Sequence, residues 1–264
     1  PGDKVIIQQP VYDPFAELIK KTGRVMVNNG LICNDGLYEM DFPLLEEQAA
    51  DPDAKIMILC SPHNPVGRVW TKEELARVGE ICKKNNVLVI ADEIHSDLVY
   101  AGYVHTPFAL ASDAPHLLCT SLGKTFNVAG LRLANIFSSS AELKKQYDQE
   151  IDAYSYSASN TFGLEMVQAA YSPEGEAWLE ELLVYLQGNV EVVSEWCQKH
   201  NVGFTAPQGT FLCWLDLGSA GLTDEEIIKK IIMGKEVICV PGPWFGKGGE
   251  GHLRLNIGCT RKTL

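Results

Sequence analysis

Lys124 stands in a turn of small residues, with Ser121 three positions before it and Arg132 eight positions after it. One strand–helix–strand unit earlier, Asp92 ends the apolar run NVLVIAD. A lysine can form an imine with an aldehyde, a hydroxyl and a guanidinium can bind a phosphate, and a buried acid can keep a pyridine nitrogen protonated. The combination predicts a site for pyridoxal 5'-phosphate (PLP).

Each of these residues also has an ordinary structural interpretation. A lysine in a turn rich in glycine and serine is more often a solvated surface residue. Asp92 can equally be a helix N-cap or a solvated acid at a strand end. We expect Glu93, which follows it, to form a structural salt bridge. The pyridoxal phosphate interpretation therefore depends on the combination and not on any single residue.

Three further residues are candidates for contacts with the cofactor or the substrate. Asn64, in SPHNPVG, would donate its amide to the phenolic oxygen of the cofactor, although a rigid turn explains the same motif; we expect the Asn64–Pro65 bond to be cis. Tyr12, in QPVYDP, is placed to stack on the ring, or is a core tyrosine. Arg254, in the alternating strand HLRLNIG, would bind the α-carboxylate of an amino acid, unless it faces solvent on an edge strand.

The composition limits the class of protein and its partners. The chain has 264 residues, of which 46% are apolar, so it can bury a sizeable core. Its formal net charge of −12 argues against a nucleic acid or an anionic membrane as partner. No signal peptide or transmembrane span is visible in the sequence. We therefore expect a soluble, acidic, cytoplasmic protein that acts on a small molecule.

Eight cysteines are scattered along the chain without a CxxC pair, and several lie inside apolar runs. This distribution favours buried free thiols in a reducing compartment over disulfide bonds or a metal site.

The elements that must position these residues follow an alternating pattern. Short β-branched runs alternate with amphipathic helical stretches, which indicates a mostly parallel sheet with helices on both faces. In such sheets, ligands bind at the carboxyl ends of the strands, where SPHNPVG, DEIH and SLGK all begin. The predicted strands cover residues 4–12, 24–29, 54–60, 86–93, 116–122 and 133–139, and the predicted helices cover 13–23, 71–85 and 141–154.

A single helical pattern runs over residues 174–200, and the rhythm changes after it. A hairpin over 203–217, a helix over 223–234 and strands over 237–243 and 252–259 predict a small α/β domain. We place the boundary near Trp178, which gives a PLP-binding large domain of 1–178 and a small C-terminal domain of 179–264. The chain begins at Pro1 within an apparent domain and stops after a strand, so we expect a fragment that lacks both ends.

The motifs SPHNPVG, ADEIH, SLGKTFNVAGLR and RLNIG resemble those of fold-type-I PLP enzymes of the class I/II aminotransferase superfamily. The resemblance covers essentially the whole chain. It implies the fold described above, with a segment before Pro1, a final helix after Leu264, and a homodimer whose active site is built across the interface. It also implies Lys124 as the imine lysine, Asp92 at the ring nitrogen, Asn64 at the phenolic oxygen, Ser121 and Arg132 at the phosphate, Tyr12 stacking on the ring and Arg254 on the substrate carboxylate.

Within this superfamily, the sequence looks most similar to the C–S lyases that resemble cystathionine β-lyase. His95 stands where related aminotransferases carry a tyrosine that touches the phenolic oxygen. The lyase branch similarly reads DEIH followed by His-x-Pro-Phe, as at residues 105–108 here, and the residues PH before Asn64 and VW after Arg68 also look like that branch. A structural role for His95 stays open.

The resemblance leads to three functional hypotheses. The first is β-elimination of L-cystathionine or related cysteine S-conjugates to a thiol, pyruvate and ammonia, with Lys124 taking the α-proton. The second is an aminotransferase, which uses the same lysine, acid and arginine and differs in where the carbanion is protonated. The third is a non-catalytic regulatory module on the same fold. The intact set of Lys124, Asp92, Asn64 and Arg254 weighs against this third hypothesis.

Overall fold

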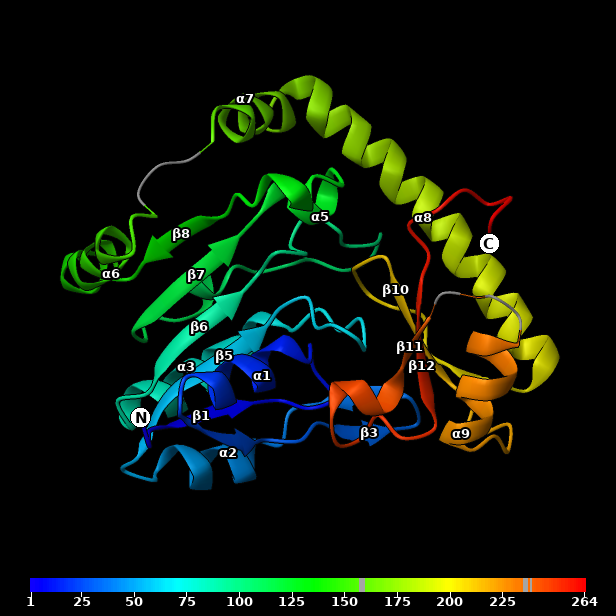
Figure 1. Ribbon diagram of the computed structural model, residues 1–264, viewed down its shortest axis with the longest axis horizontal. Helices are drawn as coiled ribbons and strands as arrows, with labels where there is room; N and C mark the ends of the chain where they lie inside the picture. Colours follow the sequence, from blue (N-terminus) through cyan, green and yellow to red (C-terminus); the bar gives the residue numbers. More distant parts are fainter. Residues whose placement is uncertain (157–159, 235–236, 238) are drawn as a thin grey trace.

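The computed structural model describes residues 1–156, 160–234, 237 and 239–264, and its largest feature is a six-stranded sheet (Figure 1). The strand order is β2-β1-β5-β6-β7-β8, and every neighbouring pair is parallel except β7 and β8. The predicted mostly parallel sheet is therefore confirmed. Its strands are β1 (Lys4–Ile7), β2 (Val25–Asn28), β5 (Ala54–Cys60), β6 (Leu88–Asp92), β7 (His116–Thr120) and β8 (Asn135–Ser138).

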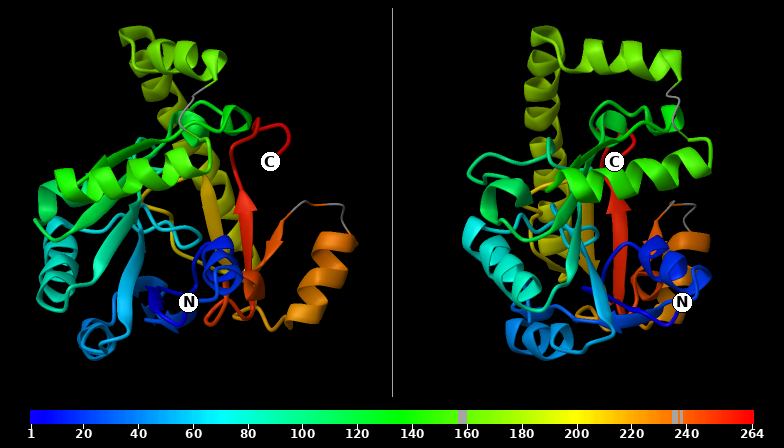
Figure 2. Two further views of the ribbon diagram at one scale, coloured as in Figure 1. Left: turned by 60° about the vertical axis from the view of Figure 1, so that its left-hand side comes forward. Right: turned by 90° about the vertical axis from the view of Figure 1, so that its left-hand side faces the viewer.

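Helices cover both faces of this sheet (Figure 2). Helix α1 (Pro14–Lys21) packs on the face that carries Val5, Ile7 and Ile58. Helices α2 (Phe42–Ala49), α3 (Lys72–Lys84) and α4 (Phe108–Ala111) cover the opposite face. Helix α6 (Ala141–Ala153) lies along β8. This arrangement confirms the predicted layers.

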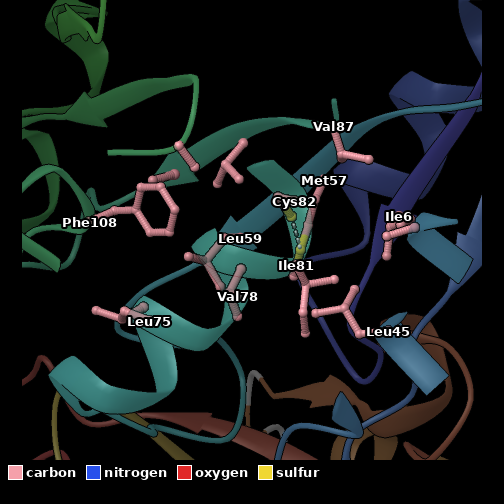
Figure 3. Packing of buried hydrophobic residues seen from close by; sticks show 14 of the residues in the cluster. Ile6, Leu45, Met57, Leu59, Leu75, Val78, Ile81, Cys82, Val87 and Phe108 are labelled. Carbon is pink, nitrogen blue, oxygen red and sulfur yellow. Dashed lines mark hydrogen bonds between the residues drawn. The ribbon is translucent and has the colours of Figure 1, made fainter. Parts of the chain in front are cut away.

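A large cluster of buried hydrophobic residues lies between α3 and the centre of the sheet (Figure 3). Successive residues of β5 point to opposite faces, so that Met57 and Leu59 contact the α2–α4 layer while Ile58 packs under α1. The sequence T-K-E-E starts α3 with a capping box, in which Thr71 and Glu74 each accept a hydrogen bond from the other's backbone N–H.

A second sheet forms from the C-terminal part of the chain, in the order β11-β12-β10-β9, with every neighbouring pair antiparallel. The C-terminal half of the long helix α8 (Pro173–His200) packs on it, and the predicted helix over 174–200 is confirmed to within one residue. The predicted hairpin over 203–217 is confirmed as β9 (Gly203–Phe204) and β10 (Leu212–Asp216), and strand β12 (His252–Asn256) lies inside the predicted 252–259.

Other parts of this region differ from the prediction. The predicted helix over 223–234 consists of α9 (Asp224–Glu226) and a π-helical segment, Ile227–Met233. Of the strand predicted over 237–243, only β11 (Val240–Pro241) forms, a 3-10 helix, Gly242–Phe245, follows it directly, and residue 238 lies outside the described residues. The predicted domain boundary at Trp178 falls inside α8, and the division into two domains stays a prediction.

Several short elements were not predicted from the sequence. Strands β3 (Ile32–Asn34) and β4 (Leu37–Glu39) form a hairpin whose two turn residues, Asp35 and Gly36, both have positive φ. An Asp-Gly pair is a strong signal for such a turn, so the hairpin was readable from the sequence. Helix α7 (Thr161–Ala170) also went unpredicted. Within the described part of the chain, no helix combines the length and the apolarity that crossing a bilayer requires.

All eight cysteines are free thiols. Four of them, Cys60, Cys82, Cys197 and Cys213, are buried, as expected. Cys33 is exposed, so the expectation of burial was wrong there, because it lies on the solvated β3–β4 hairpin.

Candidate active site

The predicted site residues follow three neighbouring parallel strands. Asn64 lies in the turn after β5, Asp92 is the last residue of β6, and Lys124 lies in the short helix α5 (Leu122–Thr125) after β7. Because β5, β6 and β7 are adjacent and parallel, their carboxyl ends meet at one edge of the sheet. The topology therefore brings together residues that are 60 positions apart in sequence (64 to 124).

Both ends of α5 are fixed by side chains, and this holds Lys124 in place. Ser121 caps the helix by accepting a hydrogen bond from the Gly123 N–H, and its own hydroxyl donates to the Leu133 carbonyl at 2.7 Å. At the other end, the Thr125 hydroxyl donates to Asp97 Oδ2, also at 2.7 Å.

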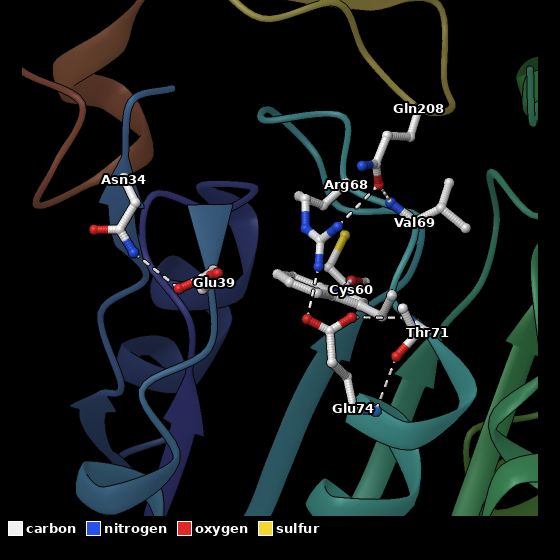
Figure 4. A network of polar contacts seen from close by, with 9 residues as sticks. Asn34, Glu39, Cys60, Arg68, Val69, Thr71, Glu74 and Gln208 are labelled. Carbon is white, nitrogen blue, oxygen red and sulfur yellow. Dashed lines mark hydrogen bonds and ion pairs between the residues drawn. The ribbon is translucent and has the colours of Figure 1, made fainter. Parts of the chain in front are cut away.

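The turn that carries Asn64 is hydrogen-bonded to the loop between β9 and β10 of the second sheet (Figure 4). The carboxamide oxygen of Gln208 accepts hydrogen bonds from Arg68 Nη1 at 3.1 Å and from the Val69 N–H at 2.8 Å. Gly67 has a φ of +72°, and a Cβ there would lie 2.5 Å from the Cβ of Pro207. Only glycine fits this contact without displacing the neighbouring loop. The Asn64–Pro65 bond is cis, as predicted.

A cavity of about 650 Å³ lies between this edge of the sheet and the second sheet, and Tyr12, Asn64, His95, Lys124 and Arg254 all line it. Its size falls within the range typical of cofactor and ligand sites.

Arg254 reaches this cavity from β12. Its Nη1 donates a hydrogen bond of 3.0 Å to Asn64 Oδ1, which joins two residues 190 positions apart. This bond occupies the oxygen of the Asn64 amide, and the amide nitrogen makes no hydrogen bond to any described residue. Partial burial lowers the pKa of Arg254 from its usual value. The predicted inward orientation of Arg254 is therefore confirmed.

Burial also controls the charge of Asp92 and His95. Desolvation raises the pKa of Asp92 to about 6, although the Ile94 N–H and the positive charge of Lys124 both act to lower it. His95 is buried, and desolvation together with the charges of Lys124 and Arg254 lowers its pKa to about 3. His95 is consequently neutral at pH 7, with its ring edge-on to Phe211 at 5.8 Å.

The predicted salt bridge of Glu93 is confirmed. Glu93 Oε2 lies 2.8 Å from His105 Nε2, and Oε1 accepts a hydrogen bond from the Phe108 N–H at 2.7 Å. The pair ties the loop after β6 back to the strand end that carries Asp92.

Ser121 and Arg132, like Asp92, do not line the cavity with the other predicted residues. The Ser121 hydroxyl is engaged as the cap of α5. Arg132 is exposed, with a φ of +50°, at the end of the 3-10 helix Ala129–Leu131. Their role at a phosphate stays a prediction.

Helix α8 contributes one wall of the cavity, and none of the residues in this wall was predicted from the sequence. The four residues of this wall are spaced as on one face of a helix, and a sequence pattern of that kind normally predicts packing into a hydrophobic core. Trp178 also stacks on Phe126, two residues after Lys124, with ring centroids 5.2 Å apart. The residues of this wall are Trp178, Leu182, Tyr185 and Leu186.

Comparisons with known proteins agree with this geometry. "Cystathionine beta-lyase PatB" of Bacillus subtilis is 39% identical over 269 residues, covering 100% of this chain and 69% of the relative. Among solved structures, a PLP-bound putative aminotransferase from Clostridium difficile has a TM-score of 0.94 at 36% identity, covering 99% of this chain and 68% of that one. The PLP-bound C–S lyase from Staphylococcus hominis has a TM-score of 0.89 at 33% identity, covering 98% and 67%.

The profile of a single family, described as aminotransferase class I and II, matches residues 1–264, which is the full length of the chain. The fold, the positions of Lys124 and Asp92 at adjacent strand ends, and the relatives all agree with this match. The chain belongs to the aminotransferase class I and II family.

Proposed function

We propose that this protein is a PLP-dependent C–S lyase that converts L-cystathionine or a related cysteine S-conjugate to a thiol, pyruvate and ammonia. The observation that carries the proposal is the 3.0 Å hydrogen bond between Arg254 and Asn64 in a cavity that Lys124 also lines. It places a carboxylate-binding guanidinium, an amide donor and an amine around one space large enough for a cofactor and an amino acid.

The residues around the ring end of the cavity fit PLP. Asp92 lies at the strand end, where the Lys124 charge acts on its carboxyl group, and a carboxyl with a pKa of about 6 can hold a proton shared with a pyridine nitrogen. The amide nitrogen of Asn64 donates no hydrogen bond to any described residue, so it can donate one to an anionic phenolic oxygen. Tyr12 lines the same cavity and would stack on the ring. When bound, PLP supplies an electron sink for the carbanion left at the α-carbon.

The side chains then have separate tasks. Arg254 binds the α-carboxylate of the substrate and fixes its orientation. Lys124 Nζ takes the α-proton, and departure of the β-thiolate follows from the electrons that this deprotonation releases. His95, neutral at pH 7, adds no positive charge that would compete with Arg254 for the carboxylate. The aminoacrylate that leaves the site hydrolyses in water to pyruvate and ammonia.

The test is pyruvate release from L-cystathionine by the protein with PLP and without any keto acid. We expect pyruvate and thiol in equal amounts at catalytic rates. Absence of both products, with enzyme that binds PLP, would contradict the lyase.

A second candidate is an aminotransferase, which the likeness to the C. difficile protein favours. It would convert one equivalent of amino acid in a half-reaction, and it would turn over only when a keto acid is added. A dependence of turnover on added keto acid therefore separates the two activities.

We further infer that the protein pairs with a second copy of itself and works in the cytoplasm. Large apolar side chains of α7 and α8 are exposed, among them Phe162 at 79% and Val184 at 75%, and such surface favours a protein partner. The free thiols suit a reducing compartment. Light scattering at micromolar concentration, giving twice the monomer mass or the monomer mass alone, decides the first point.

A further inference from the structure

The guanidinium of Arg254 is stabilised by an aromatic ring and not by an acid. Its Cζ lies 4.8 Å from the centroid of the Phe245 ring. Among the residues that the structure describes, no carboxylate lies within ion-pair distance of Arg254, and its one hydrogen bond goes to the neutral amide of Asn64. A partly buried guanidinium on a ring face is favourable, and the contact leaves its N–H edge available to a ligand.

The ring of Phe245 is itself held rigidly. It is buried, at 3% exposure, and packs edge-on against Trp214 with centroids 5.3 Å apart and planes at 83°. Trp214 lies directly opposite Arg254 in the β10–β12 pairing, so the two side chains share one face of the sheet. Phe245 thus lies between the buried indole of Trp214 and the guanidinium.

The indole is fixed on its other sides. Trp214 Nε1 donates a hydrogen bond of 3.0 Å to the hydroxyl of Tyr38, which is buried on β4. His252 stacks on the indole, with centroids 4.9 Å apart and planes at 13°. These contacts connect the β3–β4 hairpin, through Trp214 and Phe245, to Arg254.

We propose that Phe245 is a positioning residue for substrate binding: its ring face holds the Arg254 guanidinium in place, so that the N–H groups not donated to Asn64 remain available to an amino-acid carboxylate. This inference rests on the proposed function, because it assigns the carboxylate of the substrate to Arg254. An acid in the place of Phe245 would hold the guanidinium as firmly but would occupy the same N–H groups that the substrate needs. An aromatic ring avoids this competition.

The test measures the binding of L-alanine, which has the α-carboxylate and no β leaving group, to the PLP-loaded enzyme. Phe245→Leu keeps an apolar side chain and removes the ring face, and we expect L-alanine to bind about 10- to 30-fold more weakly. Phe245→Tyr keeps the ring face and should restore the affinity. L-alaninamide, which lacks the carboxylate, should bind equally well to all three proteins.

With L-cystathionine, Phe245→Leu should raise KM by a similar factor and change kcat by less than about twofold, since the loss affects binding of the substrate and the transition state alike. Phe42→Leu is the matched control: the Phe42 ring also lies under an arginine, with Arg77 Cζ 4.3 Å from its centroid, but neither residue lines the cavity. It should leave the affinity for L-alanine unchanged.

The outcomes separate this inference from the function on which it rests. If the wild-type enzyme binds L-alanine and Phe245→Leu binds it equally well, the role of Phe245 is overturned and the proposed function stands. If Phe245→Leu weakens L-alaninamide as much as L-alanine, the effect is a general distortion of the site and the inference is also overturned. If the wild-type enzyme binds neither L-alanine nor L-cystathionine, both proposals fail.

Discussion

Two helices of equal length pack against the large sheet in different ways. Both α3 and α6 have 13 residues. Helix α3 buries five of them, whereas α6, all of whose residues are described, buries none. The strands differ in the same way, because β5 has five buried residues and β8 has none. The sheet therefore has a densely packed half around β5 and β6 and a sparsely packed half around β8.

The candidate site lies across the border between these halves. Asn64 follows β5 and Asp92 ends β6, and both are largely buried. Ser121 and Arg132 lie between β7 and β8, and Arg132 is exposed. If PLP binds as we propose, the residues predicted at its ring therefore lie in the densely packed half, whereas Arg132, predicted at its phosphate, is exposed.

Lys124 lies in α5, directly after β7 and so where the two halves of the sheet meet, and replacing its side chain should have the largest effect. Lys124→Ala should lower pyruvate release at least 1000-fold, to about the level expected when a base and a covalent anchor are lost together. The hydrogen bonds that fix the two ends of α5 do not involve the side chain of Lys124. The midpoint temperature of unfolding should therefore stay nearly unchanged. Lys145→Ala on the exposed surface of α6 is the control, and its activity should equal that of the wild type.

The packing difference predicts unequal costs for truncating one side chain in each half. Leu59 is fully buried under α3, so Leu59→Ala should lower the free energy of unfolding by about 2–5 kcal/mol. Phe137, on β8, is 56% exposed, so Phe137→Ala should cost about 1 kcal/mol or less. Urea denaturation followed by tryptophan fluorescence measures both. Equal losses would show that the two halves are equally packed and would end the comparison.

The sequence predicted the dense half better than the rest of the molecule, for a physical reason. Strands that are apolar on both faces and end in DEIH or SPHNPVG identify their own carboxyl ends, and parallel pairing then places Asn64 beside Asp92. The inward orientation of Arg254 also followed, since an arginine on a strand between leucines needs an anion, but its hydrogen bond to Asn64 was not predicted. Local pattern and global fold agree at these positions.

Other features depend on tertiary contacts that no local pattern encodes. The stripe on α8 that starts at Trp178 has the spacing of core residues, and only the course of the helix turns it toward the cavity. The exposure of Arg132 depends on what packs beside the segment before β8. Phe245 approaches Arg254 because the 3-10 helix Gly242–Phe245 follows β11 directly. The strand that we predicted over 237–243 runs into this helix, so the sequence pattern did not indicate it.

A substitution of Arg132 tests its predicted contact with the phosphate of PLP directly. If its guanidinium binds the phosphate of PLP, Arg132→Ala should weaken PLP about tenfold, because a charge-assisted hydrogen bond at an exposed position contributes roughly 1–2 kcal/mol. Arg24→Ala, in the loop before β2 and away from the cavity lining, is the control. Titration of the cofactor-free protein with PLP, followed by absorbance, gives both affinities. Unchanged binding in Arg132→Ala would remove Arg132 from the site.

The last test concerns the pH dependence of stability that Asp92 causes. Its pKa is raised from the usual 3.8 to about 6, mainly because burial disfavours the charged carboxylate. Between these two pH values the unfolded chain has released a proton that the folded chain retains, so this group lowers the stability of the cofactor-free protein as the pH rises from about 4 to about 6. Asp92→Asn is neutral throughout, and its stability relative to the wild type should therefore rise over the same interval and then level off. Urea denaturation at pH 4, 5, 6 and 7 measures this difference, and buried histidines such as His63 and His95 contribute equally to both proteins.

Bound PLP should reduce the slope, since a protonated pyridine facing Asp92 lowers the pKa of the carboxyl again. A difference that does not vary with pH would mean that folding does not raise the pKa of Asp92 and that solvent, not the core, surrounds its carboxyl group.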